Sequence, residues 1–198
     1  DTEKYYYDRR ANFLAQKGIS IDHLPPSFFI GGNTKQVWEN ILRDDYDNWD
    51  VPTLQEEYNA YKQDNPLPYK ELIFPDVLKV LNEVKSRGLK IGLASSSVKA
   101  DILRALEENH LDGFFDVVLS GEGFKESKPN PEIYLTALKH LNVEANQALI
   151  IEDSEKGIAA GVAAGVEVWA IKDNRFGMDQ GAAKGLLDNL MDVLDLLK

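Results

Sequence analysis

The feature that most constrains the fold is a regular alternation of short apolar runs with amphipathic segments, which begins near residue 73. Short apolar runs are typical of buried strands, whereas apolar residues spaced three and four apart indicate helices. Strict alternation of the two predicts an α/β fold, a Rossmann-like parallel sheet with helices on both faces. The predicted strands cover 89–97, 114–122, 148–153 and 166–173, and the predicted helices cover 75–88, 98–111, 130–141, 154–165 and 186–198.

The first third of the chain has a different pattern. Between residues 2 and 67, apolar and aromatic side chains recur at helical spacing, and Gly and Pro residues separate the pieces. No strand pattern interrupts them. We therefore expect a small helical bundle in this part of the chain.

Composition excludes several classes of function. The 198 residues carry a formal net charge of −11 and contain no cysteine. An acidic surface repels nucleic acids and anionic membranes, and disulfides and cysteine metal sites are impossible. No apolar run approaches the roughly 20 residues that span a bilayer, and the polar start "DTEKYYYDRR" is unlike a secretory signal. We expect a cytoplasmic protein that binds neither nucleic acid nor membrane.

Candidate site residues follow the predicted strands, because ligands of parallel α/β sheets bind beyond the strands' carboxyl ends. The adjacent carboxylates Glu152 and Asp153 follow one strand and suit a hard cation such as Mg²⁺. The same segment also fits a helix start, since Ser154 is a good N-cap and acids are favourable there. Neither interpretation excludes the other. The remaining strand-end residues are Ser95–Ser97, Ser120–Gly121 and Lys172–Asp173.

Two further segments are ambiguous when taken singly. The hydroxyl group of Ser95 and nearby backbone N–H groups fit either a phosphoryl oxygen or an ordinary serine-rich turn before a helix. Lys128 precedes Pro129 and fits either a cation held near the strand ends or a solvated loop lysine.

The order of these segments is more specific than any one of them. "LASSS", then "SKPNPEIY", then "IIEDSEKGIAAGVAAG" resemble the second, third and fourth motifs of the haloacid dehalogenase superfamily of phosphoryl-transfer enzymes. The resemblance covers residues 73–172. The helical bundle at 4–70 resembles the inserted cap of the branch that contains phosphoglycolate phosphatases and β-phosphoglucomutases. The resemblance thus implies a cap at 4–70 and an α/β core formed by 1–3 and 71–198.

The resemblance implies roles for individual residues. Ser95 would bind the transferring phosphoryl group, and Lys128 would offset the charge of nucleophile and phosphate. Asp153 would be a direct Mg²⁺ ligand, and Glu152 would ligate Mg²⁺ directly or through water. Substrate contacts would come from Ser96, Ser97 and Lys99 in the core, and from Lys35 in the cap.

The family's first motif, roughly D-x-D-G-x-x-x-D-[ST]-E, is matched only at its end by "DTE". Its nucleophilic aspartate, its acid–base aspartate and the strand that presents them would lie upstream of Asp1. That strand is central in the family, between the strands at 89–94 and 148–151. We expect residues 1–198 alone not to form an aspartyl phosphate. The alternative is a noncatalytic binding protein with this fold, or a truncated and inactive fragment of an enzyme.

The resemblance also implies a substrate class. A cap that closes over the site favours a small phosphorylated metabolite such as a sugar phosphate, handled by a monomeric phosphatase or phosphomutase. Mutases of this branch typically carry a histidine where Tyr6 stands, whereas the serine-rich second motif resembles the mutases. The two activities stay open.

Overall fold

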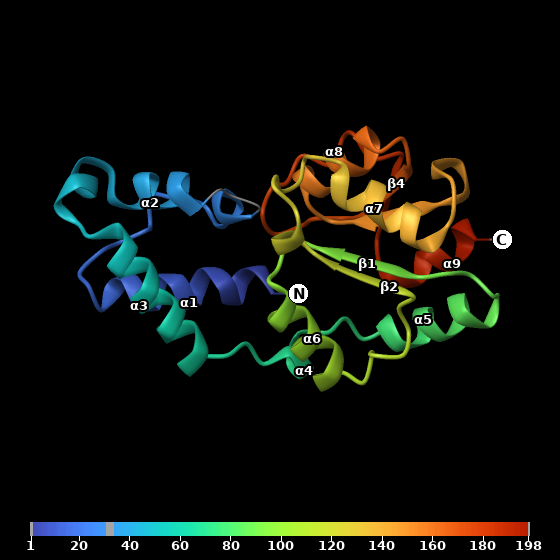
Figure 1. Cartoon of the computed structure of the whole chain (residues 1–198), viewed down its shortest axis with the longest axis horizontal. Helices are drawn as coiled ribbons and strands as arrows, with labels where there is room; N and C mark the ends of the chain where they lie inside the picture. Colours follow the sequence, from blue (N-terminus) through green and yellow to red (C-terminus); the bar gives the residue numbers. More distant parts are fainter. Residues whose placement is uncertain (1, 31–33, 198) are drawn as a thin grey trace. The chain divides into compact units, whose positions relative to one another are not determined.

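A computed structural model describes residues 2–30 and 34–197, without the side chains of residues 34–36. The chain divides into two compact units, Asp1–Leu72 and Ile73–Lys198 (Figure 1). Among the described residues, no helix combines the length and the hydropathy that crossing a membrane requires.

The first unit is helical throughout its described part, as the spacing of its apolar residues predicts. Its buried core includes Phe13, Leu14, Trp38, Leu54 and Tyr58. Trp38 satisfies its indole N–H by donating to Gln55 Oε1 at 2.8 Å. The α-helices are α1 (Glu3–Ala15), α2 (Thr34–Leu42), α3 (Val51–Asp64) and α4 (Tyr69–Leu72), with 3₁₀ turns at Pro26–Phe29 and Arg43–Asn48.

The second unit alternates strands and helices as predicted. Gly88 and Gly165 follow two of its helices with φ of 72° and 74°, a left-handed conformation in which a Cβ would be strained. The strands are β1 (Gly92–Ser95), β2 (Val117–Ser120), β3 (Leu149–Glu152), β4 (Glu167–Ile171) and β5 (Gly185–Leu187). The helices are α5 (Val77–Ser86), α6 (Lys99–Glu108), α7 (Glu132–Leu141), α8 (Glu155–Ala163) and α9 (Val193–Leu196). Short 3₁₀ turns lie at Gly121–Gly123, Ala145–Gln147 and Leu190–Asp192.

The strands form two parallel sheets rather than one. β1 pairs with β2, and the second sheet has the order β3-β4-β5. Ser95 lies opposite Ser120 in the first sheet, and Glu152 lies opposite Ala170 in the second. Among the described residues, β1 and β3 therefore each pair with another strand along one edge only. The central strand expected between them stays a prediction.

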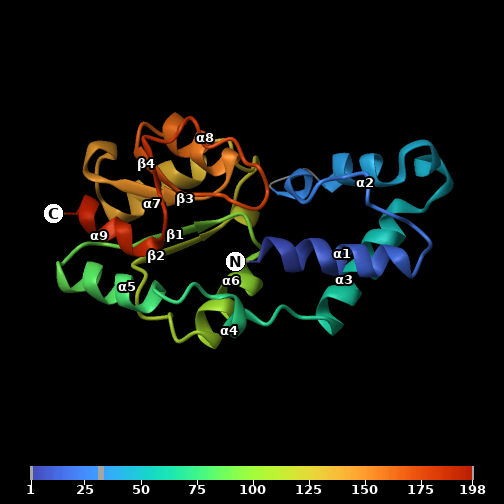
Figure 2. The same cartoon turned by 180° about the vertical axis from the view of Figure 1, so that it is seen from behind.

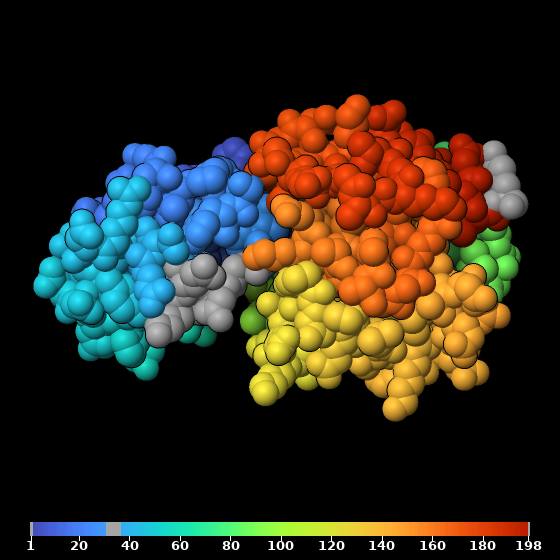
Figure 3. All heavy atoms as spheres, turned by 90° about the horizontal axis from the view of Figure 1, so that it is seen from above, coloured from blue at the N-terminus to red at the C-terminus, as the bar shows by residue number. Residues whose placement is uncertain are grey.

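Helices cover both faces of the β1–β2 sheet. α5 and α6 lie on one side and α7 on the other, as the two opposite views agree (Figures 1 and 2). Ile133 and Tyr134 of α7 pack in one cluster with Ala94 of β1 and Ile150 of β3, so the two sheets share this part of the core. Figure 3 shows the segments from yellow to red packed into one continuous surface.

The end of the chain differs from the sequence prediction. We expect a helix over 186–198, but Leu186 and Leu187 belong to β5, and only Val193–Leu196 form an α-helical turn. The physical reason is strand pairing. The register of Trp169 with Gly185 brings the Trp169 ring to 2.4 Å from where a Cβ on residue 185 would lie, so glycine permits this close approach.

Candidate active site

Three elements bring the site residues together at the carboxyl ends of the strands. β1 ends at Ser95, β3 ends at Glu152, and Lys128 comes from the loop that leads into α7. Lys128 and Glu152 form an ion pair of 2.6 Å, and each side chain is only 8% exposed. A lysine predicted near the strand ends thus lies between the two sheets and links them.

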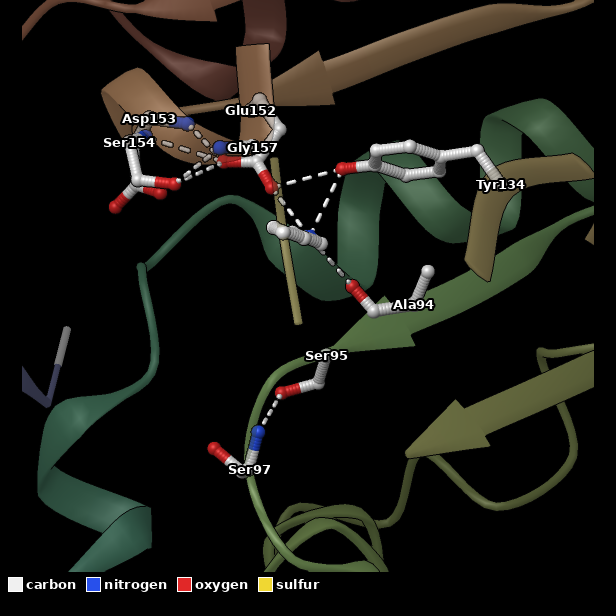
Figure 4. A network of polar contacts seen from close by, with 9 residues as sticks. Ala94, Ser95, Ser97, Tyr134, Glu152, Asp153, Ser154 and Gly157 are labelled. Atoms are coloured by element: carbon white, nitrogen blue, oxygen red, sulfur yellow. Dashed lines mark hydrogen bonds and ion pairs between the residues drawn. The ribbon is translucent and has the colours of Figure 1, made fainter. Parts of the chain in front are cut away.

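All three ammonium protons of Lys128 are directed to oxygen atoms of the protein. Nζ donates to Glu152 Oε1 at 2.6 Å, to the Tyr134 hydroxyl group at 2.9 Å and to the Ala94 carbonyl oxygen at 3.2 Å. Figure 4 shows these contacts converging from the two sheets and α7. A buried charge is tolerable only when it is paired and hydrogen-bonded, and Lys128 meets both conditions.

The Glu152 carboxylate likewise has hydrogen-bond partners at both of its oxygens. Its Oε1 accepts from Lys128 and from the Tyr134 hydroxyl group, the latter at 2.8 Å. Its Oε2 accepts from the backbone N–H groups of Asp153 and Ser154 and from the Ser154 hydroxyl group, at 2.9, 3.1 and 3.0 Å. Burial alone would raise the pKa of Glu152, but the Lys128 ammonium group and the backbone donors outweigh it and lower this pKa to about 2.

Tyr134 completes this group from the first turn of α7. Burial and the neighbouring Glu152 carboxylate raise the pKa of Tyr134 far above its usual value. Its hydroxyl group therefore stays protonated and donates a hydrogen bond to Glu152. The Lys128 ammonium group also lies 4.7 Å from the centre of the Tyr134 ring, a cation–π distance.

Gly157 provides the space that the Glu152 carboxylate occupies. A Cβ on residue 157 would lie 2.0 Å from Cδ and Oε1 of Glu152 and 2.4 Å from Oε2. The backbone N–H of Gly157 donates to Ser154 Oγ at 3.1 Å, which makes Ser154 the N-cap of α8 as predicted. The glycine and the cap together bring the carboxylate against the first turn of α8.

Asp153 differs from its neighbour in exposure and in bonding. It is exposed, and among the described residues no N–H or O–H group of another residue donates to its carboxylate oxygens. Desolvation by surrounding atoms and the negative charge of Glu152 raise the pKa of Asp153. Solvent at its open side screens these effects and limits the shift.

The donor set fits a Mg²⁺ ion only in part. Asp153 offers free carboxylate oxygens, whereas both oxygens of Glu152 are engaged within the protein. In the described residues, no group of three or more His, Asp or Glu side chains is arranged to hold a metal ion. The acid pair therefore supplies part of a coordination sphere.

The serine-rich loop after β1 is organised by its own hydrogen bonds. Ser95 Oγ accepts from the Ser97 N–H at 3.1 Å, and the Ser97 carbonyl accepts from Ser120 Oγ at 2.8 Å. Ser96 and Lys99 are exposed, and the Lys99 N–H donates to Glu122 Oε2 at 2.6 Å, which caps α6. Ser95, Ser96, Ser97 and Lys99 thus share one strand exit. Lys35 is the second residue of α2 in the other unit, and its side chain lies outside the described residues.

Three contributors to the site escape sequence reasoning. Tyr134 lies within the third motif, but its apolar neighbours make it look like an ordinary core aromatic. Gly157 is recognisable as a glycine inside a helix, where it costs about 1 kcal/mol relative to alanine. Gln180 bonds the backbone of Asp153 from a segment with no motif, so no local signal marks it.

We expect Tyr134→Phe to lower the free energy of unfolding by about 1–2 kcal/mol, because it removes a hydrogen bond to a charged carboxylate while preserving the ring. Denaturant unfolding followed through the amide signals of β3 and β4 measures this change. A variant as stable as the wild type would contradict a structural role for the hydroxyl group.

Comparison with known sequences agrees with this geometry. Residues 1–171 match the profile of the haloacid dehalogenase-like hydrolases. A phosphorylated carbohydrates phosphatase from Thermotoga maritima is 35% identical over 129 residues, which cover 63% of this chain and 59% of that protein. A phosphoglycolate phosphatase from Aquifex aeolicus is 30% identical over 139 residues, which cover 70% of this chain and 63% of that protein. These matches thus span less than two thirds of either relative.

Solved structures share the fold. A β-phosphoglucomutase from Clostridium difficile superposes with a TM-score of 0.78 at 25% identity, covering 98% of this chain and 90% of that one. A putative β-phosphoglucomutase from Thermotoga maritima gives 0.76 at 25% identity, covering 100% of this chain and 92% of that one. The prediction from the three motifs is confirmed, and the chain belongs to the haloacid dehalogenase-like hydrolase family.

Proposed function

We propose that this protein takes part in Mg²⁺-dependent phosphoryl transfer from a small phosphorylated metabolite, through an aspartyl phosphate. The observation that carries the proposal is the convergence of Ser95, Lys128 and the Glu152–Asp153 pair at the strand ends. Phosphoryl transfer requires phosphate-binding donors, neutralising charge and a cation in one place, and these residue types supply each of them.

The two acids take different roles in this proposal. Asp153, with free oxygens, would bind Mg²⁺ directly, while Glu152, whose oxygens already accept five hydrogen bonds within the protein, would orient the ligand loop. Bound Mg²⁺ would stabilise negative charge on the phosphoryl oxygens. Lys128 neutralises Glu152, so the buried part of the site is uncharged overall before substrate arrives.

The nucleophile is proposed to come from chain upstream of Asp1. There, a strand ending in two aspartates would insert between β1 and β3, whose facing edges each lack a partner among the described residues. The first carboxylate attacks phosphorus, the bond from phosphorus to the ester oxygen breaks, and the second aspartate protonates that oxygen. Ser95 holds a phosphoryl oxygen during this exchange. Residues 1–198 alone would therefore be inactive.

The proposed substrate is a phosphorylated carbohydrate. Two similar proteins support this substrate class, a phosphorylated carbohydrates phosphatase and a β-phosphoglucomutase. The helical bundle at 4–70 is proposed to act as a cap, and Lys35 within it stays a predicted substrate contact. Ser96, Ser97 and Lys99 contribute contacts from the exit of β1.

The test compares two chains in a Mg²⁺-dependent assay with a panel of sugar phosphates. We expect residues 1–198 to show no turnover, and a chain extended upstream through an in-frame D-x-D-G segment to be active. Asp153→Asn in the extended chain should abolish Mg²⁺-dependent hydrolysis, whereas Asp112→Asn, an exposed acid elsewhere in the unit, should retain it. Turnover by residues 1–198, or retained activity in Asp153→Asn, would refute the proposal. An unrelated upstream sequence would favour a noncatalytic binding protein.

A further inference from the structure

Gln180 is a buried amide that none of the predicted motifs includes. It lies in the segment between β4 and β5, and it is 9% exposed. Its Nε2 donates to the Asp153 and Ile171 carbonyl oxygens, both at 2.8 Å, and its Oε1 accepts from the Asp173 N–H at 2.9 Å. One side chain thus joins the residue that follows β3 to the last residue of β4.

The bond to Asp153 completes a set of restraints around that residue. Its N–H donates to Glu152 Oε2 at 2.9 Å, which fixes the peptide group before it. The next peptide group is held at both ends, because its C=O accepts from Gln180 and its N–H, from Ser154, donates to Glu152 Oε2. With both flanking peptide planes fixed, the direction in which the Asp153 side chain leaves the backbone is fixed as well.

Gln180 is itself held by an ordered loop. The Asp173 carboxylate accepts from the backbone N–H groups of Arg175, Phe176 and Met178 at 2.9 to 3.1 Å. This closes residues 173–178 into a turn beyond β4, and the Asp173 N–H is left pointing at Gln180. The amide is therefore anchored on the β4 side and presents its donors toward Asp153.

We propose that Gln180 is a positioning residue, which acts through the Asp153 backbone to aim the Asp153 carboxylate at the cation. The inference rests on the proposed function, because it assigns Asp153 as a metal ligand. Residues that orient metal ligands change metal affinity about 10- to 100-fold when they are replaced. A residue that merely closes a loop would change stability and leave the affinity of the folded protein unchanged.

The test uses Mn²⁺ as a paramagnetic substitute for Mg²⁺ in the folded chain extended upstream through the D-x-D-G segment, with broadening of the amide signals of residues 152–157 as the readout. Gln180→Met keeps the length of the side chain and removes its hydrogen bonds, and we expect an affinity loss of about 10-fold or more. Gln147→Met is the matched control. Gln147 bonds the Glu144 N–H near the opposite end of β3, so its replacement should leave Mn²⁺ affinity unchanged.

Each outcome separates the two claims. Wild-type affinity in folded Gln180→Met would overturn the role of Gln180 and leave the metal site standing. Absence of any Mn²⁺ effect near Asp153 in the extended wild-type chain would overturn the proposed function and this inference with it. If Gln180→Met does not fold, Gln180→Asn, which stays polar but is one methylene shorter, is measured in its place with the same expectation.

Discussion

Replacing Lys128 with methionine is expected to lower the free energy of unfolding by about 3–5 kcal/mol, because it leaves a buried carboxylate without its counter-ion. The Glu152 side chain is 8% exposed and has no route to solvent that keeps its five hydrogen bonds. The Ala94 carbonyl oxygen loses its donor as well. Denaturant unfolding, followed through the amide signals of β3 and β4, measures the loss.

Two controls separate the effect of breaking the ion pair from the effect of removing a lysine. Lys139→Met removes an exposed lysine from α7 and should change the free energy of unfolding by less than about 0.5 kcal/mol. Adding Glu152→Gln to Lys128→Met removes the uncompensated charge and should recover part of the loss. A Lys128→Met chain as stable as Lys139→Met would show that the buried pair contributes nothing.

The pH dependence of stability has a defined sign. The folded pKa of Glu152, about 2, lies below the usual value of 4.5. The stability that this group contributes is therefore present above about pH 4.5 and is lost as the pH falls toward 2. In Lys128→Met, burial acts without the ammonium group and raises the Glu152 pKa. The difference between the variant and the wild type should shrink below pH 4.5.

Replacing Gly157 with alanine is expected to destabilise the chain by about 2–4 kcal/mol, because a methyl group would occupy the place of the Glu152 carboxylate. The carboxylate ends a flexible side chain, but moving it breaks its bonds to Lys128, Tyr134 and the backbone. The sign of the change in the free energy of unfolding separates this steric effect from helix propensity. Helix propensity alone would make alanine stabilising by up to about 1 kcal/mol.

The control for this prediction is Gly113→Ala. A Cβ at position 113 meets no atom within 4 Å, so alanine there should have little effect on the free energy of unfolding. The displaced carboxylate should also release the Asp153 and Ser154 N–H groups, which faster hydrogen exchange at these two amides would reveal. If Gly157→Ala were as stable as the wild type, the carboxylate would have an alternative position of equal energy.

Local sequence predicted the alternating fold and most of the residues at the strand ends. Glu152, Asp153 and Ser154 follow directly from a strand exit followed by a small-residue helix, and the N-cap role of Ser154 is confirmed. The helix predicted over 186–198 was wrong at its start, because pairing with β4 recruits Leu186 and Leu187 into a strand. Pairing depends on a partner distant in sequence, which a local pattern does not contain.

Strand and helix periodicity and the order of the motifs are local properties of the sequence. They were sufficient to predict the fold class, the family and the placement of Ser95, Lys128 and the acid pair at the strand ends. The difference between the two acids depends instead on tertiary contacts. Glu152 became the buried partner of Lys128 and Tyr134, while Asp153 kept free oxygens. The same Glu-Asp sequence is compatible with either acid being the buried one. The choice follows from Gly157 making room and from Gln180 holding the Asp153 carbonyl, contacts between segments that only folding brings together.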